Sequence, residues 1–316
     1  MEQESAHRTA WIIAGPTCSG KSALALDLAR RVGGTVINAD SMQVYRELPI
    51  LTAQPTAAEQ ASVPHRLYGV RPVAEPGDAA WWRRAALDAM AQSGRPILCG
   101  GTGLYLSALT QGIADIPPPD PAMRQEARAL LDELGPAGLH ARLVAADPDT
   151  AAGLRPSDGQ RIARAWEVWR STGRGLLAWQ SVRTPPPPWR FRMVLLDPPR
   201  DVLRLAIARR FDAMLAAGAL AEVEAVRHHD RALPAMRAHG VVELLEHIDG
   251  RATLAEAGAR TTLVTGQYTK QQATWFRNRR VVDPQNLHTI YARFDGLAQS
   301  SESLGDVLWS FLRDYS

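Results

Sequence analysis

The chain has 316 residues, of which 46% are hydrophobic, and a formal net charge of +3. This length predicts about two domains, and the mild basic excess is compatible with a polyanionic partner. Cys18 and Cys99 lack the spacing of a zinc site or a disulfide framework, and no apolar run is as long as a membrane span. The polar first ten residues have no signal-peptide hydrophobic region, so we expect a cytoplasmic protein with no membrane partner.

Short apolar segments alternate with amphipathic helices in the first part of the chain. Strands are predicted at residues 11–14, 35–37 and 96–98, and helices at residues 22–32 and 81–91. Such alternation is typical of a parallel sheet with crossover helices. The predicted fold class is therefore α/β, with a parallel sheet flanked by helices.

A phosphate-binding loop (P-loop) joins the first strand to the first helix. Its sequence, Gly15-Pro16-Thr17-Cys18-Ser19-Gly20-Lys21-Ser22, matches G-x-x-x-x-G-K-[ST] in full. The glycines let successive backbone N–H groups point inward, and the helix N-terminus adds partial positive charge. Lys21 adds a full charge, and the Ser22 hydroxyl suits Mg²⁺. The motif predicts a polyphosphate ligand held by all eight residues, without specifying a nucleotide.

Polar residues follow the next two strands. Asp40 follows the strand at 35–37, and Thr102 follows the strand at 96–98, where most P-loop hydrolases carry an aspartate for Mg²⁺. Ligands of open parallel sheets lie beyond the carboxyl ends of the strands, so both residues are expected near the bound phosphates. The residues alone leave Asp40 as a magnesium ligand, a base or a helix cap. Asp197, which follows a later strand at 191–196, could be the aspartate that supports Mg²⁺, but two prolines follow it, so we prefer a role as the cap of a turn.

Two proline clusters, at residues 117–121 and 185–188, bracket a segment with helical patterning. Helices are predicted there at residues 123–134, 139–146 and 160–171. Proline runs are stiff and extended, as in linkers. The expected domains are a P-loop core beginning at 1–116, a helical insertion at 117–188, and a core completion with C-terminal helices at 189–316. A long helix is predicted from 202 to about 228.

Cationic and aromatic residues interleave at two places. Residues 267–280 carry Tyr268, Trp275 and Phe276 among Lys270, Arg277 and further arginines, and the predicted helix at 160–171 carries three arginines and two tryptophans. Such patterns suit RNA binding by backbone contact and base stacking. Amphipathic helices with solvated basic faces and buried aromatics are the alternative. Two basic faces on one chain with a phosphate loop favour RNA.

Five segments, in this order, resemble the IPP transferase family of tRNA dimethylallyltransferases. They are GPTCSGKS, ADSMQVYRELPILTAQP, VPHRLYGV, GGTGLYLSAL and KQQATWFRNR, and the similarity extends from about residue 11 to about residue 280. The resemblance implies transfer of a dimethylallyl group from its diphosphate to the N6 amine of the adenine 3′ to the tRNA anticodon. It also implies Mg²⁺ as cofactor and a helical insertion that embraces the anticodon stem-loop. We expect a monomer.

The resemblance also implies roles for individual residues. Asp40 matches the general base, Thr102 a residue near diphosphate and acceptor, and Arg210 a catalytic arginine. Ser22 is the expected metal ligand. Residues expected to touch tRNA are Asp40, Ser41, Met42, Gln43, Thr102, Arg124, Gln160, Arg161, Ile162, Ala163, Arg164, Lys270 and Arg277.

The chain departs from the family pattern at several positions. Leu51 and Gln54 stand where a glycine and a lysine are usual, and Val241 and Val242 stand where tyrosine and arginine are usual. Arginines are also usual at Gln271 and Ala206. These departures bear on tRNA affinity and substrate preference more than on the reaction.

Three alternative functions are compatible with parts of the pattern. A small-molecule P-loop kinase would consume ATP without a prenyl donor. An enzyme that prenylates free adenine nucleotides would act on AMP but not on tRNA. A non-catalytic, nucleotide-controlled RNA-binding module would not need Asp40 or Arg210.

Overall fold

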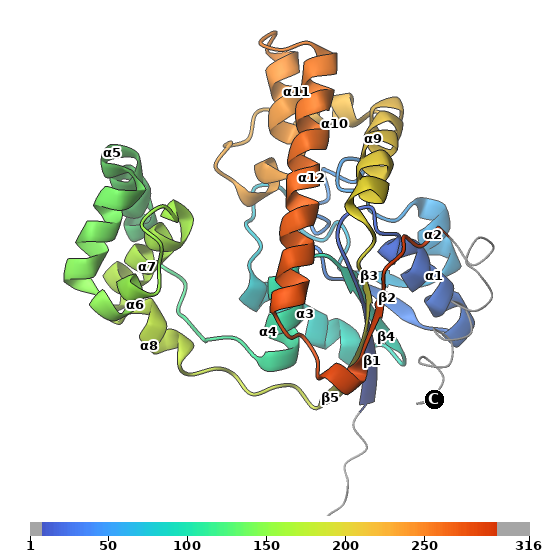
Figure 1. Cartoon of the computed structure of the whole chain (residues 1–316), viewed down its shortest axis with the longest axis horizontal. Helices are drawn as coiled ribbons and strands as arrows, with labels where there is room; N and C mark the ends of the chain where they lie inside the picture. The colour runs from blue at the N-terminus through green and yellow to red at the C-terminus, as the bar shows by residue number, and fades with distance from the viewer. Residues whose placement is uncertain (1–7, 296–316) are drawn as a thin grey trace, which may run out of the picture. The chain divides into compact units, whose positions relative to one another are not determined.

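The computed structural model describes residues 8–295 (Figure 1). The described chain divides into two compact units. One unit is Gly112–Pro185, and the remaining residues form the other, which contains the P-loop. None of the helices in this part of the chain combines the length and apolarity that a bilayer span requires.

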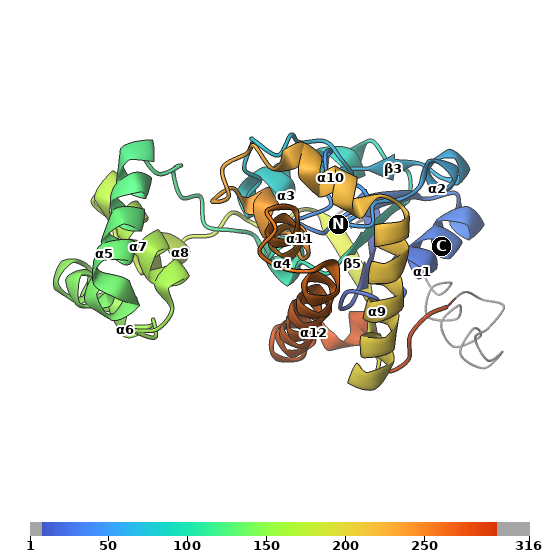
Figure 2. The same cartoon turned by 90° about the horizontal axis from the view of Figure 1, so that it is seen from above.

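Within residues 8–295 the P-loop unit contains a six-stranded parallel sheet with the order β3-β2-β4-β1-β5-β6. The strands are β1 (Arg8–Ala14), β2 (Thr35–Asn38), β3 (His65–Arg66), β4 (Pro96–Gly100), β5 (Trp189–Leu196) and β6 (Leu287–Ile290). Helix α1 (Lys21–Val32) covers one face, and α3 (Ala79–Ala91) and α4 (Gly103–Gln111) cover the other (Figures 1 and 2). The predicted α/β class is confirmed.

Burial on both faces explains the apolar strands. Trp11 and Ile13 of β1 pack with Leu24 and Leu28 of α1, and all five residues of β4 are buried. Strands covered on both sides read as continuous apolar runs, which is the pattern of Trp-Ile-Ile-Ala in β1. The parallel register brings the carboxyl ends of β1, β2, β4 and β5 to one edge, where the P-loop begins.

A second layer of helices stands beyond this edge. Helices α9 (Arg200–Ala216) and α12 (Leu254–Asn278) pack side by side, and α11 (Val241–Ile248) packs against α12 (Figures 1 and 2). Helix α10 (Ala219–Val226), the short α2 (Ala57–Ser62) and the 3₁₀ helices η1 (Pro234–Arg237) and η2 (Pro284–Asn286) complete the unit. A Thr253–Glu256 capping box starts α12 and satisfies its first N–H groups.

The predicted long helix from 202 to 228 is wrong. Gly218 has φ 102°, in the left-handed region, and separates α9 from α10. Glycine adopts this conformation without the steric cost that a side chain brings, so the chain can turn there. Strands β3 and β6 were not predicted, because they have two and four residues and no clear alternation.

The unit Gly112–Pro185 consists of α5 (Pro121–Ala146), α6 (Pro148–Ala152), α7 (Gly159–Thr172) and α8 (Leu176–Gln180). Helix α5 is kinked at Gly135, which has φ 66° and ψ 175°, so its halves correspond to the two helices predicted there. Apolar residues of α5 and α7 form the core of this unit. Its two ends are joined by a bond from the Ile113 N–H to Thr184 Oγ1 (3.1 Å).

Candidate active site

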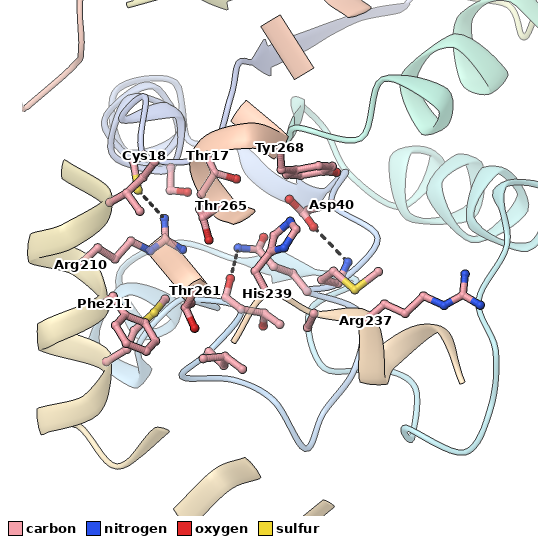
Figure 3. Close-up of a pocket in the computed structure, with 18 of the residues that line it drawn as sticks. Thr17, Cys18, Asp40, Arg210, Phe211, Arg237, His239, Thr261, Thr265 and Tyr268 are labelled. Carbon is pink, nitrogen blue, oxygen red and sulfur yellow. Dashed lines mark hydrogen bonds between the residues drawn. The ribbon is translucent and has the colours of Figure 1, made fainter. Parts of the chain in front are cut away.

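A pocket opens beside the P-loop at the carboxyl edge of the sheet (Figure 3). Its lining combines cationic and polar residues with apolar ones. Polar or charged residues beside the P-loop and the turn after β2 are Thr17, Cys18, Lys21, Ser22, Asp40, Gln43, Arg210, His239 and Tyr268. The apolar residues are Met42, Leu51, Ile207, Phe211, Met214 and Ala238, and Thr52, Arg237, Thr261 and Thr265 complete the lining.

The P-loop is held from outside by the segment that follows β6. Arg293 Nε donates to the Cys18 carbonyl and the Phe294 N–H donates to the Ser19 carbonyl, each over 3.0 Å. Gly20 has φ 91°, and a Cβ there would overlap the Phe294 backbone. These two carbonyls are therefore fixed toward the Arg293 segment, which keeps them from repelling an anion in the pocket.

Lys21 and Ser22 place a cation and a hydroxyl at the pocket. Lys21 is buried, and its Nζ lies 3.5 Å from the Pro16 carbonyl. Across residues 8–295, no group of three or more His, Cys, Asp or Glu side chains is arranged to hold a metal ion. Ser22 lines the pocket beside Lys21 and is the one residue predicted from the sequence to bind a metal ion.

Asp40 is fixed by the loop that follows β2. The buried Asn38 side chain accepts from the Asp40 N–H (2.8 Å) and donates to the carbonyls of Asp40 (2.9 Å) and Leu67 (3.0 Å). Asp40 Oδ1 accepts from the Met42 N–H (3.0 Å), so the carboxylate caps its own turn while it lines the pocket. Of the three roles considered from the sequence, the structure shows the cap, although of a turn and not of a helix, and the base and the magnesium ligand stay predictions.

Thr102 lies behind this loop. Its Oγ1 accepts from the Ser41 N–H (2.9 Å) and donates to Ser41 Oγ (3.3 Å), and its N–H donates to the Ala39 carbonyl (3.2 Å). The side chain thus ties the end of β4 to the end of β2. Thr102 and Ser41 are not among the residues that line the described pocket.

Arg210 extends from α9 toward the P-loop. Its Nη1 donates to Cys18 Sγ over 3.8 Å (Figure 3). Leu203 and Ile207, on the same side of α9, pack with Cys18. The predicted diphosphate residues Lys21 and Ser22 and the predicted catalytic residues Asp40 and Arg210 therefore line one pocket.

Gln272 joins the P-loop to the glycine turn after β4, and the sequence analysis missed it. Its side chain is 4% exposed; Oε1 accepts from the Thr17 N–H (2.9 Å) and Nε2 donates to the Gly101 carbonyl (3.0 Å). A Cβ on Gly101 would overlap this amide, so the approach requires glycine. No local pattern reveals a contact between residues 255 apart in sequence.

His239 and Tyr268 form an aromatic pair at the pocket. The sequence pattern singled out Tyr268 as a stacking residue, but it did not single out His239. Their ring centroids lie 4.8 Å apart with the planes tilted by 54°. Burial lowers the pKa of His239 from 6.5, although the charges of Glu243 and Asp40 oppose the shift, and burial raises the pKa of Tyr268 above 10.0. Both rings are therefore neutral near pH 7, which suits stacking against a flat base.

The C-terminal part of α12 carries two of the residues that were predicted to contact tRNA, Lys270 and Arg277. Lys270 is exposed. Arg277 is also exposed, but it donates to both oxygens of the buried Asp197 (2.9 and 3.0 Å). The preferred capping role of Asp197 is wrong, because its carboxylate binds this guanidinium. Phe276 is buried, as the non-functional interpretation of the aromatics requires.

The predicted RNA contacts of the unit Gly112–Pro185 divide into exposed and buried residues. Ile162 is 0% exposed and Ala163 is buried with it in the core of the unit, so a tRNA contact by either side chain is wrong. Gln160 is exposed, Arg124 is half-buried, and the Arg161 side chain is 71% exposed. Arg161 lies 3.5 Å from Asp158, and Arg164 lies 3.3 Å from Glu167.

Comparisons with known proteins agree with a P-loop transferase. The family model described as IPP transferase matches residues 43–279. The tRNA dimethylallyltransferase of Granulibacter bethesdensis is 60% identical over 98% of this chain and 99% of its own. That of Acidiphilium cryptum is 57% identical over 95% of this chain and 94% of its own.

Two solved structures share the fold. The tRNA isopentenylpyrophosphate transferase of Bacillus halodurans aligns with a TM-score of 0.66 and 31% identity over 97% of both chains. A eukaryotic dimethylallyltransferase captured in crystallographic snapshots acting on tRNA aligns with a TM-score of 0.78 and 25% identity, over 96% of this chain and 78% of its own. The chain belongs to the IPP transferase family.

Proposed function

We propose that this chain transfers a dimethylallyl group from dimethylallyl diphosphate to tRNA and releases diphosphate. The acceptor is the N6 amine of the adenine next to the anticodon on its 3′ side, position 37. The relatives named tRNA dimethylallyltransferase support this activity. The observation that carries it is the pocket in which a P-loop, a carboxylate and an apolar wall meet.

The polar and the apolar residues of the pocket suit the two ends of the donor. The eight P-loop residues would hold the diphosphate, with Lys21 as a buried cation and Ser22 as a ligand of Mg²⁺. When bound, Mg²⁺ would neutralise charge on the diphosphate. The dimethylallyl group would lie against Ile207 and Phe211, because it is the only apolar part of the donor.

Asp40 supplies the acid–base chemistry. An adenine amine is a weak nucleophile because its lone pair is delocalised into the ring. As the bond from N6 to the allylic carbon forms and the carbon–oxygen bond breaks, the amine proton passes to the Asp40 carboxylate. Negative charge then builds on the leaving oxygens, where Lys21, Arg210 and the loop N–H groups stabilise it.

Two further features support an adenine acceptor in RNA. The neutral pair of His239 and Tyr268, beside Asp40, offers ring faces against which an extruded base can stack (Figure 3). Thr102 would act through Ser41 by fixing the loop that carries Asp40. Met42 and Gln43, which line the pocket with Asp40, would contact the nucleotide as it enters.

Exposed and half-buried polar side chains would hold the rest of the anticodon stem-loop. These are Lys270 of the P-loop unit, and Gln160, Arg161, Arg164 and Arg124 of the unit Gly112–Pro185, which we propose is the RNA-binding insertion. Arg277 would contribute while remaining paired with Asp197. We propose a cytoplasmic monomer, because the modification is made on tRNA and one chain carries both sets of residues.

The deciding experiment incubates the protein with bulk tRNA and dimethylallyl diphosphate and identifies the modified nucleosides by mass. We expect prenylated adenosine from the wild type and none from Lys21→Ala, which loses the buried cation of the P-loop. Parallel reactions with AMP as acceptor, and with ATP in place of the donor, test the free-nucleotide and kinase alternatives. Transfer to AMP but not tRNA, or ATP consumption without a prenyl donor, would contradict the proposal.

A further inference from the structure

Glu222 of α10 is a half-buried carboxylate that is not part of the described pocket lining, and the proposed reaction gives it no role. We infer that Glu222 is a positioning residue for the acceptor side of the pocket. It holds the loop at residues 48–54, and this loop in turn fixes Gln43 and the turn that carries Asp40. The inference rests on the proposed function, because it concerns the base of that reaction.

Two consecutive backbone N–H groups donate to the Glu222 carboxylate. The Ile50 N–H donates to Oε2 over 2.7 Å, and the Leu51 N–H donates to Oε1 over 2.8 Å. Adjacent N–H groups that point the same way form a concave site for an anion, and a carboxylate can engage both at once. Glu222 therefore fixes the N–H side of the loop to α10, although Leu51 and Ile50 are 171 and 172 residues away in the sequence.

The carbonyl side of the same loop is fixed to the segment that follows β2. Gln43 Nε2 donates to the carbonyls of Thr52 and Ala53, each over 2.9 Å. Gln54 Nε2 donates to the Tyr45 carbonyl over 2.7 Å. Gln43 is 8% exposed and lines the pocket, so the loop holds a pocket side chain in place. Loss of the bonds on the N–H side would therefore loosen Gln43 as well.

The bonds continue from this segment to Asp40. The N–H of Met42, the residue before Gln43, donates to Asp40 Oδ1 over 3.0 Å (Figure 3). A base must lie within hydrogen-bond reach of the proton that it takes, and a displacement of about 1 Å caused by a distant change can slow a reaction about 100-fold. Movement of Gln43 would shift Met42, and with it the carboxylate that Met42 holds.

Leu51 extends the support of the loop to a second acceptor residue. Its side chain is 7% exposed, and a Cβ on Gly240 would lie 2.9 Å from Leu51 Cδ1. Gly240 follows His239, one of the two rings that we propose stack against the base. The loop therefore contacts the segment that carries His239 as well as the segment that carries Asp40.

The P-loop obtains its outer bonds from other elements. Gln272 of α12 accepts from one P-loop N–H, and Arg293 and Phe294 donate to two P-loop carbonyls. A change at Glu222 should therefore disturb the acceptor side of the pocket and leave the donor site in place. This separation between acceptor and donor distinguishes positioning by Glu222 from a general loss of the fold.

The test is Glu222→Gln, which keeps the size of the side chain but has only one acceptor oxygen. Its amide group would face one of the two N–H groups, donor against donor. With enzyme in excess over tRNA, we expect the single-turnover rate constant of transfer to fall about 10- to 100-fold. The calorimetric affinity for dimethylallyl diphosphate should stay near the wild-type value. A smaller folded fraction would lower the amplitude of the turnover and not its rate constant.

Glu224→Gln is the matched control, because Glu224 is on the same helix but is exposed and pairs with Arg227. It should keep the wild-type rate constant. Gln54→Met covers the case in which Glu222→Gln does not fold, because it removes the bond from the loop to the Tyr45 carbonyl without changing the described pocket lining. It should lower the rate constant in the same way. A wild-type rate constant in folded Glu222→Gln, or in Gln54→Met where that variant decides, would overturn the inference and leave the proposed function intact.

Amide exchange tests the inference without the reaction. If the wild type transfers no dimethylallyl group, the proposed function fails, but the peptide that contains Met42 should still exchange faster in Glu222→Gln than in the wild type. The reason is that the Asp40 carboxylate, which accepts from the Met42 N–H, is held less firmly. Equal exchange in this peptide would overturn the inference, whether or not transfer is observed.

Discussion

At the scale of single residues, Asp40 combines a structural bond with a place at the pocket. Its carboxylate accepts from the Met42 N–H and its backbone is held by Asn38. Asparagine caps a turn nearly as well as aspartate, but its amide cannot take a proton. We expect Asp40→Asn to keep the fold and tRNA affinity while slowing the chemical step by about 10²- to 10⁴-fold.

Single-turnover transfer on pre-bound tRNA measures this step directly. Asn38→Ala serves as a control for the loop, because it removes the bonds of the Asn38 amide and leaves the Asp40 carboxylate in place without adding a charge. Near-normal transfer by Asp40→Asn would exclude Asp40 as the base. Recovery of transfer by Asp40→Asn at high Mg²⁺ would instead identify Asp40 as a magnesium ligand.

Gln272 leads to a prediction about the donor site. Gln272→Met has similar length but leaves the Thr17 N–H and the Gly101 carbonyl without their partner. A buried polar group left without a bond costs about 1–3 kcal/mol, so the P-loop should lose its fixed shape. We expect the KM for dimethylallyl diphosphate to rise about tenfold or more, while the KM for tRNA stays near the wild-type value.

Steady-state kinetics with each substrate varied in turn separates the two constants. The matched control is Gln271→Met, on the exposed side of the same helix turn. It should change neither the KM for dimethylallyl diphosphate nor the stability of the fold. An equal rise in both KM values for Gln272→Met would indicate general loosening of α12 and not a role in holding the P-loop.

At the scale of elements, the sequence predicted those helices and strands that a local pattern of residues determines. The β1–P-loop–α1 unit and both halves of α5 follow from apolar periodicity, glycine spacing and proline. The break at Gly218 was missed because apolar spacing continues through it, and β6 is too short to show alternation. In the site, the motif residues came from spacing, whereas Gln272 reaches the P-loop and His239 reaches the pocket only through tertiary packing.

Helix α7 carries the prediction for RNA binding. Among the described residues, Arg161 pairs with Asp158 and Arg164 pairs with Glu167, each three residues away, and the two arginine side chains are 71% and 40% exposed. Ion pairs with a solvent-exposed partner contribute little to stability. The two guanidinium groups can therefore turn to phosphates. The double variant Arg161→Ala, Arg164→Ala should weaken tRNA binding and reduce the log–log salt slope by roughly one for each phosphate that is no longer bound.

Filter binding or fluorescence titration across a salt series gives this slope. Arg128→Ala, which removes another exposed arginine of the same unit outside the predicted contacts, is the control. The rate of transfer on bound tRNA should change little. A salt slope equal to that of the wild type would show that the α7 arginines face only solvent.

At the scale of the whole molecule, partly buried histidines predict the response to acid. Burial lowers the pKa of His65, His239 and His288 below their ordinary value of 6.5. The unfolded chain therefore binds protons that the folded chain does not, and stability is lost as pH falls below about 6.5. We expect the free energy of unfolding to decrease between about pH 7.5 and pH 5.5.

Urea denaturation at these two pH values measures the effect. His239→Gln should reduce the difference between them, since glutamine has no proton to bind. The control is His228→Gln, because His228 is exposed; this substitution should leave the stability difference between the two pH values unchanged. If the His239→Gln difference equals that of the wild type, another group is responsible for the acid sensitivity.

The outer bonds of the P-loop have a consequence for synthesis of the chain. The loop comprises residues 15–22, but its native contacts need much later parts of the chain. Strand β1 cannot pair with β5, and the Cys18 and Ser19 carbonyls cannot accept from Arg293 and Phe294, until those residues have been made. Pairings between such distant segments form only after the later segment has emerged from the ribosome. The nascent enzyme would thus gain the native geometry of its donor site only once Arg293 and Phe294 have been made, and a chain stalled before residue 293 would be unable to hold diphosphate in that geometry.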